Sequence, residues 1–421
     1  MDKRDFLKNL SLLSVTPPLL LTQVDQLLES NGHKNPEKLA SDEDFWKEIR
    51  NSYRLKPDYI NLENGYYCFL PQETLMHFLE HIKEVNYQGS WYMRTVQWEN
   101  KRKVAARLAD MAGCSAEELV VTRNTTESLD LVIAGVKWEQ GDEAVMAEQD
   151  YGAMLNQFKL MEKRYGIVSK KISLPNHPKT DEEIVDLYAS AITEKTKLLM
   201  VCHLVNITGQ ILPVRKICDM AHAKGVKVMV DGAHAFAQID FKISDLNCDY
   251  YGTSLHKWLS VPLGAGFLYV KKGSASDLYP LFAESDLPED DIYRLNHIGT
   301  HPVHTDLAIL NAIGFHEKIG IKRKEARLKY LQDYWTSRVR DLPRVSVNTP
   351  KEMKRHGAIG NVGIEDMEPS ELAKRLLEDH KIWTVAINRP NVAGVRITPN
   401  VYTTTEELDV FVESIKTLSR N

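Results

Sequence analysis

The chain has 421 residues, of which 43% are hydrophobic and 26% are charged, and its formal net charge is −5. This composition is typical of a soluble globular protein and lacks the basic excess of a nucleic-acid-binding protein, so we expect a small molecule as the partner. Five scattered cysteines, none of them in a C-x-x-C arrangement, argue against a disulfide framework and against a zinc site.

The first residues have the order of a bacterial export signal, with charged residues before an apolar stretch at 10–21. The charged part resembles a twin-arginine signal and contains Lys3, Arg4, Phe6, Leu7 and Lys8, with Lys3 in place of the first arginine. Two alternatives stay open: a signal for the periplasm, or an N-terminal extension of a cytoplasmic protein. No run of about 18 apolar residues occurs, so we expect no membrane span.

Three parts follow from composition and pattern. Residues 1–43 form an N-terminal extension, and the polar stretch 31–44 predicts a linker. We expect a large domain over residues 44–304 and a smaller α+β domain over residues 305–421.

The large domain alternates short β-branched runs with stretches of helical periodicity. Strands are predicted at 119–121, 144–146, 198–202, 226–230 and 267–270, and helices at 128–136, 154–165 and 214–223. Such alternation predicts βα units and a mostly parallel sheet. In the last part, strands are predicted at 345–347, 359–364 and 395–397, before a final amphipathic helix that ends near Leu418.

Two polar segments follow strands of this sheet. The strand at 226–230 ends on Asp231-Gly232-Ala233-His234, and a second buried run ends on Ser254-Leu255-His256-Lys257-Trp258. Open parallel sheets bind ligands at the carboxyl ends of their strands. A lysine that forms an imine and an aspartate that holds a pyridinium nitrogen are the two groups that pyridoxal phosphate requires of a protein.

Thr125 and Thr126 lie where the strand at 119–121 turns into a helix. Their hydroxyls and the free backbone N–H groups at the helix N-terminus make an anion cradle. The alternative is an ordinary helix cap. With Lys257 at another strand end of the same sheet, the two positions can hold the two ends of one pyridoxal phosphate.

The order and the residues of seven segments resemble those of the class V aminotransferase family of fold type I pyridoxal phosphate enzymes. The segments are Asn124–Glu127, Glu148–Tyr151, His203–Gly209, Asp231–His234, Ser254–Lys257, Gly299–Thr300 and Gly394–Arg396. The sequence around Asp231 and Lys257 is similar to that of the isopenicillin N epimerase-like branch of the family. The resemblance implies an α/β fold with a large, mostly parallel-sheet domain and a smaller α+β C-terminal domain, and a homodimer with shared active sites.

Residue by residue, the resemblance implies Lys257 as the Schiff-base lysine and proton shuttle. It implies that Asp231 pairs with the pyridine N–H and that His234 packs near the ring or bonds its phenolic oxygen. Tyr151 matches the ring-stacking position, and Asn206 is implied to contact the ring substituents.

The same resemblance implies a phosphate site and a substrate clamp. The phosphate cup contains Thr125, Thr126, Ser254 and His256, together with Thr300, which would reach the phosphate of the neighbouring subunit. Arg396 resembles the clamp for a substrate carboxylate, and Arg389 is a second candidate.

One feature of the family's cysteine desulfurases is missing. Those enzymes carry a nucleophilic cysteine shortly before the clamp arginine, and residues 382–396 contain none, which excludes persulfide chemistry at that position. A lyase that lets the cofactor expel sulfur directly is not excluded.

The expected activity is therefore cleavage of the Cα–H bond of an amino acid held through Lys257, leading to epimerisation or transamination. The alternative is C–S lysis of a cysteine derivative. Epimerisation needs an acid opposite Lys257, for which Tyr151 and His234 are the candidates. A hypothesis of a different functional class is that the chain is a non-catalytic binding protein that keeps the fold.

Overall fold

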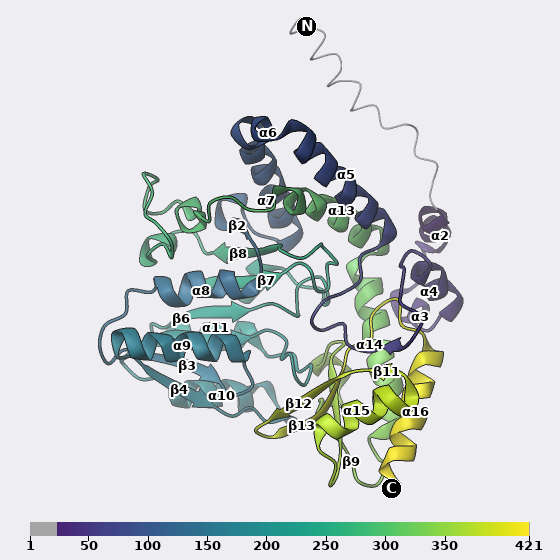
Figure 1. Ribbon diagram of the computed structural model, residues 1–421. Coiled ribbons are helices and arrows are strands. Elements are labelled where there is room, and N and C mark those ends of the chain that lie inside the picture. The colour runs from purple at the N-terminus through teal and green to yellow at the C-terminus, as the bar shows by residue number, and fades with distance from the viewer. Residues whose placement is uncertain (1–22, 421) are drawn as a thin grey trace, which may run out of the picture.

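The computed structural model describes residues 23–420 (Figure 1). The export-signal pattern at residues 3–8 lies outside the described residues. Among residues 23–420, no helix combines the length and the apolar character needed to cross a membrane.

The large sheet has seven strands in the order β2-β8-β7-β6-β5-β3-β4. Their bounds in chain order are β2 Leu119–Thr122, β3 Glu143–Ala147, β4 Val168–Ile172, β5 Thr196–Cys202, β6 Lys227–Asp231, β7 Tyr250–Ser254 and β8 Gly266–Val270. Only β8 runs antiparallel to its neighbours, β2 and β7. The mostly parallel sheet expected from the alternating pattern is thus confirmed.

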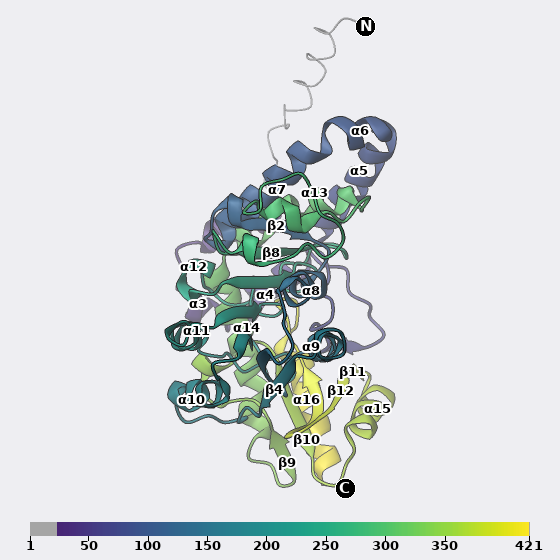
Figure 2. The same ribbon diagram turned by 90° about the vertical axis from the view of Figure 1, so that its left-hand side faces the viewer.

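Helices cover both faces of this sheet because its strands are apolar on both sides. Met229 packs in the core formed with α8 and α9, whereas its neighbours Val228 and Val230 pack in the core formed with α10 and α11. Figure 2 shows the two helix layers on opposite sides of the sheet. The bounds are α8 Thr125–Gly135, α9 Gly152–Tyr165, α10 Asp181–Ala191, α11 Val214–Ala223 and α12 Ile243–Leu246.

A group of three long helices and one short helix lies beside β2 at one end of the sheet (Figure 1). They are α5 Gln72–Gln88, α6 Ser90–Thr95, α7 Gln97–Ala112 and α13 Val303–Ile319. Helix α13 packs against α5 and α7. The division of the chain near residue 304 stays a prediction.

A four-stranded antiparallel sheet, in the order β12-β13-β10-β9, forms the smaller part. Its elements are α14 Ile321–Val339, β9 Val345–Val347, β10 Gly360–Ile364, α15 Pro369–His380, β12 Val385–Arg389, β13 Val392–Ile397 and α16 Thr405–Ser419. Trp335 of α14 meets Phe411 of α16 edge-on in its core. The short strands β1 Ile60–Asn61 and β11 Ile382–Trp383 pair in parallel nearby. Four 3-10 helices span Ala116–Glu118, Ala275–Asp277, Ile292–Asn296 and Met353–Arg355.

The polar stretch at 31–44, expected to be a linker, contains the short helix α3 and the start of α4. The N-terminal helices are α2 Gln23–Asn31, α3 Pro36–Leu39 and α4 Glu43–Arg50. Asn35 and Asp42, whose polarity suggested a linker, accept hydrogen bonds from the first turns of α3 and α4. Leu39 and Trp46 are buried, so this segment packs into the core of the molecule.

Candidate functional site

Gly266 allows two strand ends to approach each other at the edge of the large sheet. It pairs with Thr122 at the end of β2 and with Ser254 at the end of β7. A Cβ at this position would lie 2.6–2.8 Å from backbone atoms of Thr253 and Asn124. The absence of a side chain therefore brings the start of α8 against the end of β7.

This close approach joins two predicted phosphate ligands. Ser254 Oγ accepts a hydrogen bond from the Thr125 backbone N–H over 2.8 Å and lies 2.7 Å from Thr125 Oγ1. Thr126 is half-buried at the same helix N-terminus, and its side chain forms no hydrogen bond within residues 23–420. His256 lies two residues after Ser254, and its Nδ1 is buried with no partner in the described chain.

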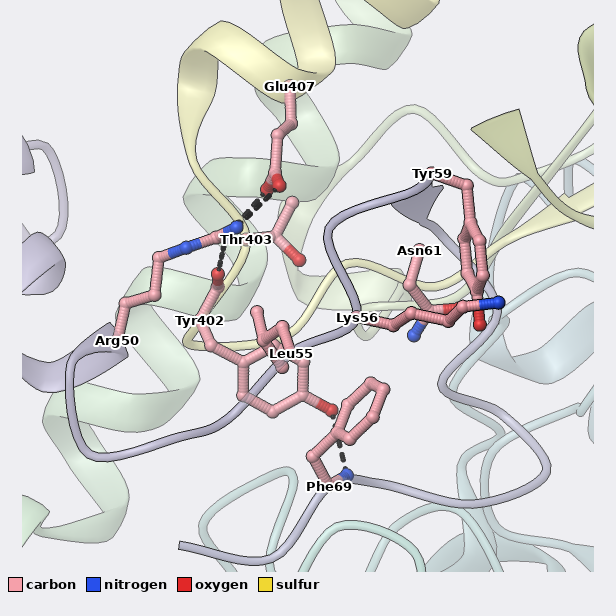
Figure 3. A pocket seen from close by; sticks show the side chains of 9 residues that line it. All are labelled: Arg50, Leu55, Lys56, Tyr59, Asn61, Phe69, Tyr402, Thr403 and Glu407. Carbon is pink, nitrogen blue, oxygen red and sulfur yellow. Dashed lines mark hydrogen bonds and ion pairs between the residues drawn. The ribbon is translucent and has the colours of Figure 1, made fainter. Parts of the chain in front are cut away.

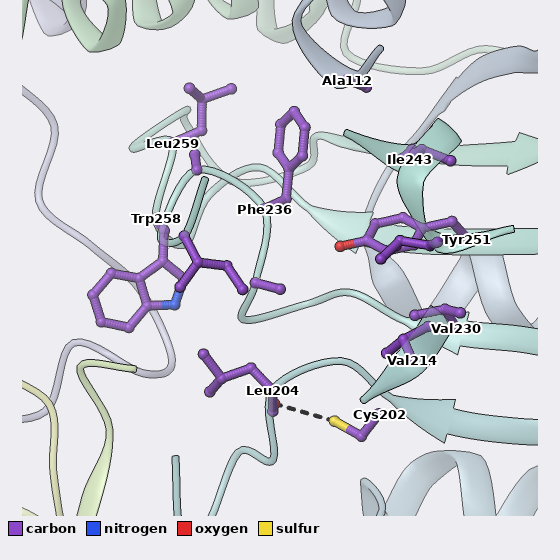
Figure 4. Close-up of a cluster of buried hydrophobic side chains, with 14 of the residues drawn as sticks. Ala112, Cys202, Leu204, Val214, Val230, Phe236, Ile243, Tyr251, Trp258 and Leu259 are labelled. Carbon is purple, nitrogen blue, oxygen red and sulfur yellow. Dashed lines mark hydrogen bonds between the residues drawn. The ribbon is translucent and has the colours of Figure 1, made fainter. Parts of the chain in front are cut away.

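The turn that carries Lys257 is fixed by its neighbours. Trp258 is fully buried and lies close to Leu204 and Phe236 in the core (Figure 4). Lys324 Nζ donates a hydrogen bond to the Trp258 carbonyl. These contacts leave the Lys257 side chain as the part of the turn that faces the site.

His234 links Trp258 to Lys257. The Trp258 indole N–H donates to His234 Nδ1 over 3.3 Å, and His234 Nε2 lies 3.0 Å from Lys257 Nζ. Burial, and then the charge of Lys257, lower the pKa of His234 well below its usual value, so the ring is neutral. Because Nδ1 accepts from Trp258, the ring proton sits on Nε2, and Lys257 must accept it as a neutral amine.

The electrostatics of Lys257 favour its neutral form more than in a free lysine. Its pKa is lowered to about 8, mainly by burial; Asp231 acts against this shift and Arg396 adds to it. Asp231 is itself buried at the end of β6, and burial raises its pKa, while the Ala233 N–H that it accepts over 3.0 Å and Lys257 act against that shift. A nucleophilic amine and a buried carboxylate therefore meet at one edge of the sheet.

Arg396 and Asn206 are brought together from distant parts of the chain. Arg396 Nη1 donates to the Asn206 backbone carbonyl over 3.1 Å. The guanidinium also pairs with Glu63, through Nε to Oε2 at 3.1 Å and through Nη2 to Oε1. Sequence reasoning missed Glu63, which follows β1 and has no local signal that connects it to residue 396.

The other predicted residues lie further out. Tyr151 follows β3 at the same sheet edge and is 46% exposed. Arg389 is exposed and lies against Gly152, where a Cβ would be 3.1 Å from its Nη2. Thr300 is exposed, and in the described part of the chain it has no hydrogen bond to the other site residues.

The donor set fits pyridoxal phosphate. Within the described chain the buried Asp231 carboxylate accepts one hydrogen bond, so it retains capacity for a pyridine N–H. Lys257 supplies the amine, and Thr125 with Ser254 supplies hydroxyl groups at a helix N-terminus, where a phosphate is favoured.

Comparisons with known proteins agree with this chemistry. The family model described as Aminotransferase class-V matches residues 72–411. The isopenicillin N epimerase of Streptomyces clavuligerus is 28% identical over 397 residues, which cover 89% of this chain and 98% of the relative. A cysteine desulfurase of Haloferax volcanii is 25% identical over 331 residues, covering 73% of this chain and 76% of the relative.

The solved structures support the same fold. The apo structure of a cysteine desulfurase from Thermococcus onnurineus superposes with a TM-score of 0.78 at 21% identity, covering 89% of this chain and 98% of that chain. The expected fold type I architecture is confirmed by this likeness. The chain belongs to the aminotransferase class-V family.

Proposed function

We propose that this protein binds an α-amino acid through Lys257 and moves the proton on Cα. As a member of the aminotransferase class-V family, the chain is a pyridoxal-phosphate-dependent enzyme. The observation that carries the residue assignment is the contact of 3.0 Å between Lys257 Nζ and His234 Nε2, which favours the neutral, reactive form of the lysine.

The cofactor would be held by residues at the ends of three strands, β2, β6 and β7. Asp231 would bind the pyridine nitrogen, and Thr125, Thr126, Ser254 and His256 would bind the phosphate. When bound, pyridoxal phosphate supplies an electron sink for the charge that develops at Cα.

Three further residues would lie around the cofactor ring and the lysine. Tyr151 would stack on the ring, and Asn206 would contact its substituents. His234 would stay beside the lysine and orient its amine. The half-exposed position of Tyr151 next to the start of α9 supports an open face on its side of the site.

Lys257 would act as the base. Its pKa of about 8, well below that of a free lysine, makes the neutral form, which accepts a proton, available from neutral to mildly alkaline pH. Arg396 would bind the substrate carboxylate, and Arg389, on the side of Gly152, is the second candidate.

Epimerisation or transamination is the favoured outcome, in line with the name of the relative that covers most of this chain. Epimerisation needs an acid on the face of Cα opposite Lys257. His234 contacts Lys257 itself, so Tyr151 is the better candidate for that acid.

C–S lysis of a cysteine derivative is the second candidate, supported by the similarity to a cysteine desulfurase. The thiol of Cys68 lies near Lys257, but it is fully buried, and burial raises its pKa to about 12. The Cys68 thiolate is thus not available to receive sulfur, and the sulfur would leave directly from the substrate.

A homodimer is part of the proposal. Large apolar side chains are exposed on α5 and α6, where a second copy can cover them: Met76, Leu79, Ile82, Tyr87 and Trp91. The exposed Thr300 would then reach the phosphate site of that second copy.

The test is incubation of the holoenzyme with a panel of amino acids in deuterium oxide. Deuterium at Cα with inverted configuration indicates epimerisation, keto acid indicates transamination, and sulfide with pyruvate indicates C–S lysis. A protein that exchanges no Cα proton, or one whose Lys257→Ala variant exchanges it equally well, contradicts the proposal and favours a non-catalytic binding protein.

A further inference from the structure

A carboxylate of the chain itself occupies the guanidinium of Arg396. Nε of Arg396 donates to Glu63 Oε2 over 3.1 Å, and Nη2 donates to Glu63 Oε1. The side chains of Arg396 and Glu63 are only 9% and 7% exposed. One two-pronged edge of the guanidinium therefore already holds a carboxylate.

The rest of the guanidinium has little room for a second carboxylate. Nη1 donates to the Asn206 carbonyl, and the Gly65 backbone covers the group so closely that a Cβ there would lie 2.8 Å from Arg396 Cζ. A substrate carboxylate beside Glu63 would place two negative charges on one buried cation, which burial makes unfavourable. The substrate carboxylate must therefore replace Glu63.

The backbone beside Glu63 cannot make way for this exchange. Thr398 Oγ1 accepts hydrogen bonds from the N–H groups of Asn64 and Gly65, and the Asn64 side chain donates to the Thr398 carbonyl over 2.7 Å. The Tyr402 hydroxyl donates to Asn64 Oδ1 over 2.7 Å. The same anchoring continues along the segment, because the Tyr402 hydroxyl also accepts from the N–H of Phe69 in the pocket of Figure 3.

The side chain of Glu63, in contrast, is not tied to the rest of this anchored segment. Apart from Arg396, its carboxylate accepts the backbone N–H of Tyr66 over 3.1 Å. Tyr66 is 74% exposed, so this part of the segment lies next to solvent, into which the Glu63 side chain can turn when a substrate carboxylate takes its place.

We propose that Glu63 is a specificity-determining residue that competes with the substrate α-carboxylate for Arg396. The inference rests on the proposed function, because it takes Arg396 as the substrate clamp. Binding of an amino acid exchanges one carboxylate for another, whereas an α-amide leaves the pair of Glu63 and Arg396 intact. The wild-type enzyme therefore discriminates weakly between an amino acid and its α-amide.

The test compares wild type with Glu63→Gln, which keeps the shape and an acceptor for Arg396 but removes the charge. The holoenzymes are titrated with a panel of L-amino acids and the corresponding α-amides, and Kd is read from the cofactor absorbance and from the ligand-induced rise in Tm. For the amino acid that binds best, Glu63→Gln is expected to tighten binding relative to the amide by about 10- to 100-fold, the value of a charge-assisted hydrogen bond.

Glu43→Gln is the matched control, because Glu43 pairs with the buried Arg327 away from the site. It should leave the ratio of acid to amide unchanged. An unchanged ratio in Glu63→Gln, weaker binding of the acid, or no ligand bound by either protein overturns the proposal. The proposed function is tested separately: it fails if the wild-type protein has no borohydride-sensitive cofactor band. The ligand-induced rise in Tm then still measures the preference for acid over amide in wild type and in Glu63→Gln.

Discussion

His234 Nε2 lies 3.0 Å from Lys257 Nζ, at the end of a chain of hydrogen bonds that begins at the indole of Trp258. The order of donors along this chain favours the neutral form of the lysine. The indole can only donate, the neutral imidazole has one donor and one acceptor, and so the lysine is left as the acceptor.

Replacement of Trp258 by phenylalanine is expected to change the pH dependence of turnover. Lys257 is neutral above its pKa of about 8, so activity that depends on it as a base should rise with pH through that value. Without the indole donor, His234 can carry its proton on Nδ1 and accept from a charged lysine at Nε2, which raises the pKa of Lys257. The rising limb of a kcat profile should move to higher pH.

Trp335→Phe provides the matched control for that variant. Trp335 is also fully buried and also donates from its indole, to Gln332 over 3.1 Å, but it lies in the core of the smaller part. Its profile should match that of the wild type. Equal profiles for all three proteins would remove Trp258 from the control of Lys257.

Lys257→Ala should lose the covalently held cofactor and most of its activity. General base catalysis contributes a factor of about 10²–10⁴, and loss of the attachment to the cofactor adds to it. Borohydride reduction followed by mass spectrometry checks the attachment, and deuterium exchange at Cα checks the activity. Lys272→Ala, whose lysine is 82% exposed, should behave as wild type.

Asp231→Asn should keep the shape of the site and lose its charge. The carboxylate is buried at the end of β6, where it would hold a proton on the pyridine nitrogen. We expect kcat to fall by about 10²–10³, while cofactor still binds weakly. Stopped-flow rates of Cα deuterium exchange measure the effect, and a wild-type rate would refute the assignment of Asp231.

Gly266→Ala should weaken both the fold and the cofactor site. The new methyl group would lie 2.6–2.8 Å from the backbone of Thr253 and Asn124, so β7 and the start of α8 must separate. Overpacking of this kind costs about 1–3 kcal/mol of unfolding free energy, measurable with urea. The separation also breaks the bonds between Thr125 and Ser254, so cofactor affinity should fall in parallel.

Gly314→Ala is the control for this prediction. Gly314 lies within α13, and a Cβ there has no atom within 4 Å. Alanine favours a helix over glycine by about 1 kcal/mol, so this variant should be as stable as wild type or more stable. A Gly266→Ala protein that is equally stable would show that the two strand ends do not depend on that glycine.

The large sheet was predictable because its signals are local. The run at 198–202 and the helix at 214–223 appear in the structure as β5 and α11, since β-branched runs and helical periodicity are read within a few residues. The same holds for the final helix, which begins after the capping threonine Thr404. The short helix within the polar stretch at 31–44 was not predicted, because helix caps and linkers share the same residue types.

Site residues could be predicted only where each sits in a motif. Lys257, Asp231 and Thr125 were predicted from the strand ends that carry them, and the structure places Thr125 against Ser254. Glu63 could not be found, since its partner lies 333 residues away and a lone glutamate carries no pattern. The part played by Trp258 depends on hydrogen-bond directions, which sequence does not encode.

The helices at the start of the described chain have a consequence for biosynthesis. Arg50 of α4 pairs with Glu407 of α16 over 2.7 Å, although the two residues are 357 positions apart in the sequence (Figure 3). At a synthesis rate of about 5–20 residues per second, α4 waits roughly 20–70 s on the ribosome before its partner is made. The ion pair between this early-translated segment and α16 is therefore among the last contacts of the fold to form.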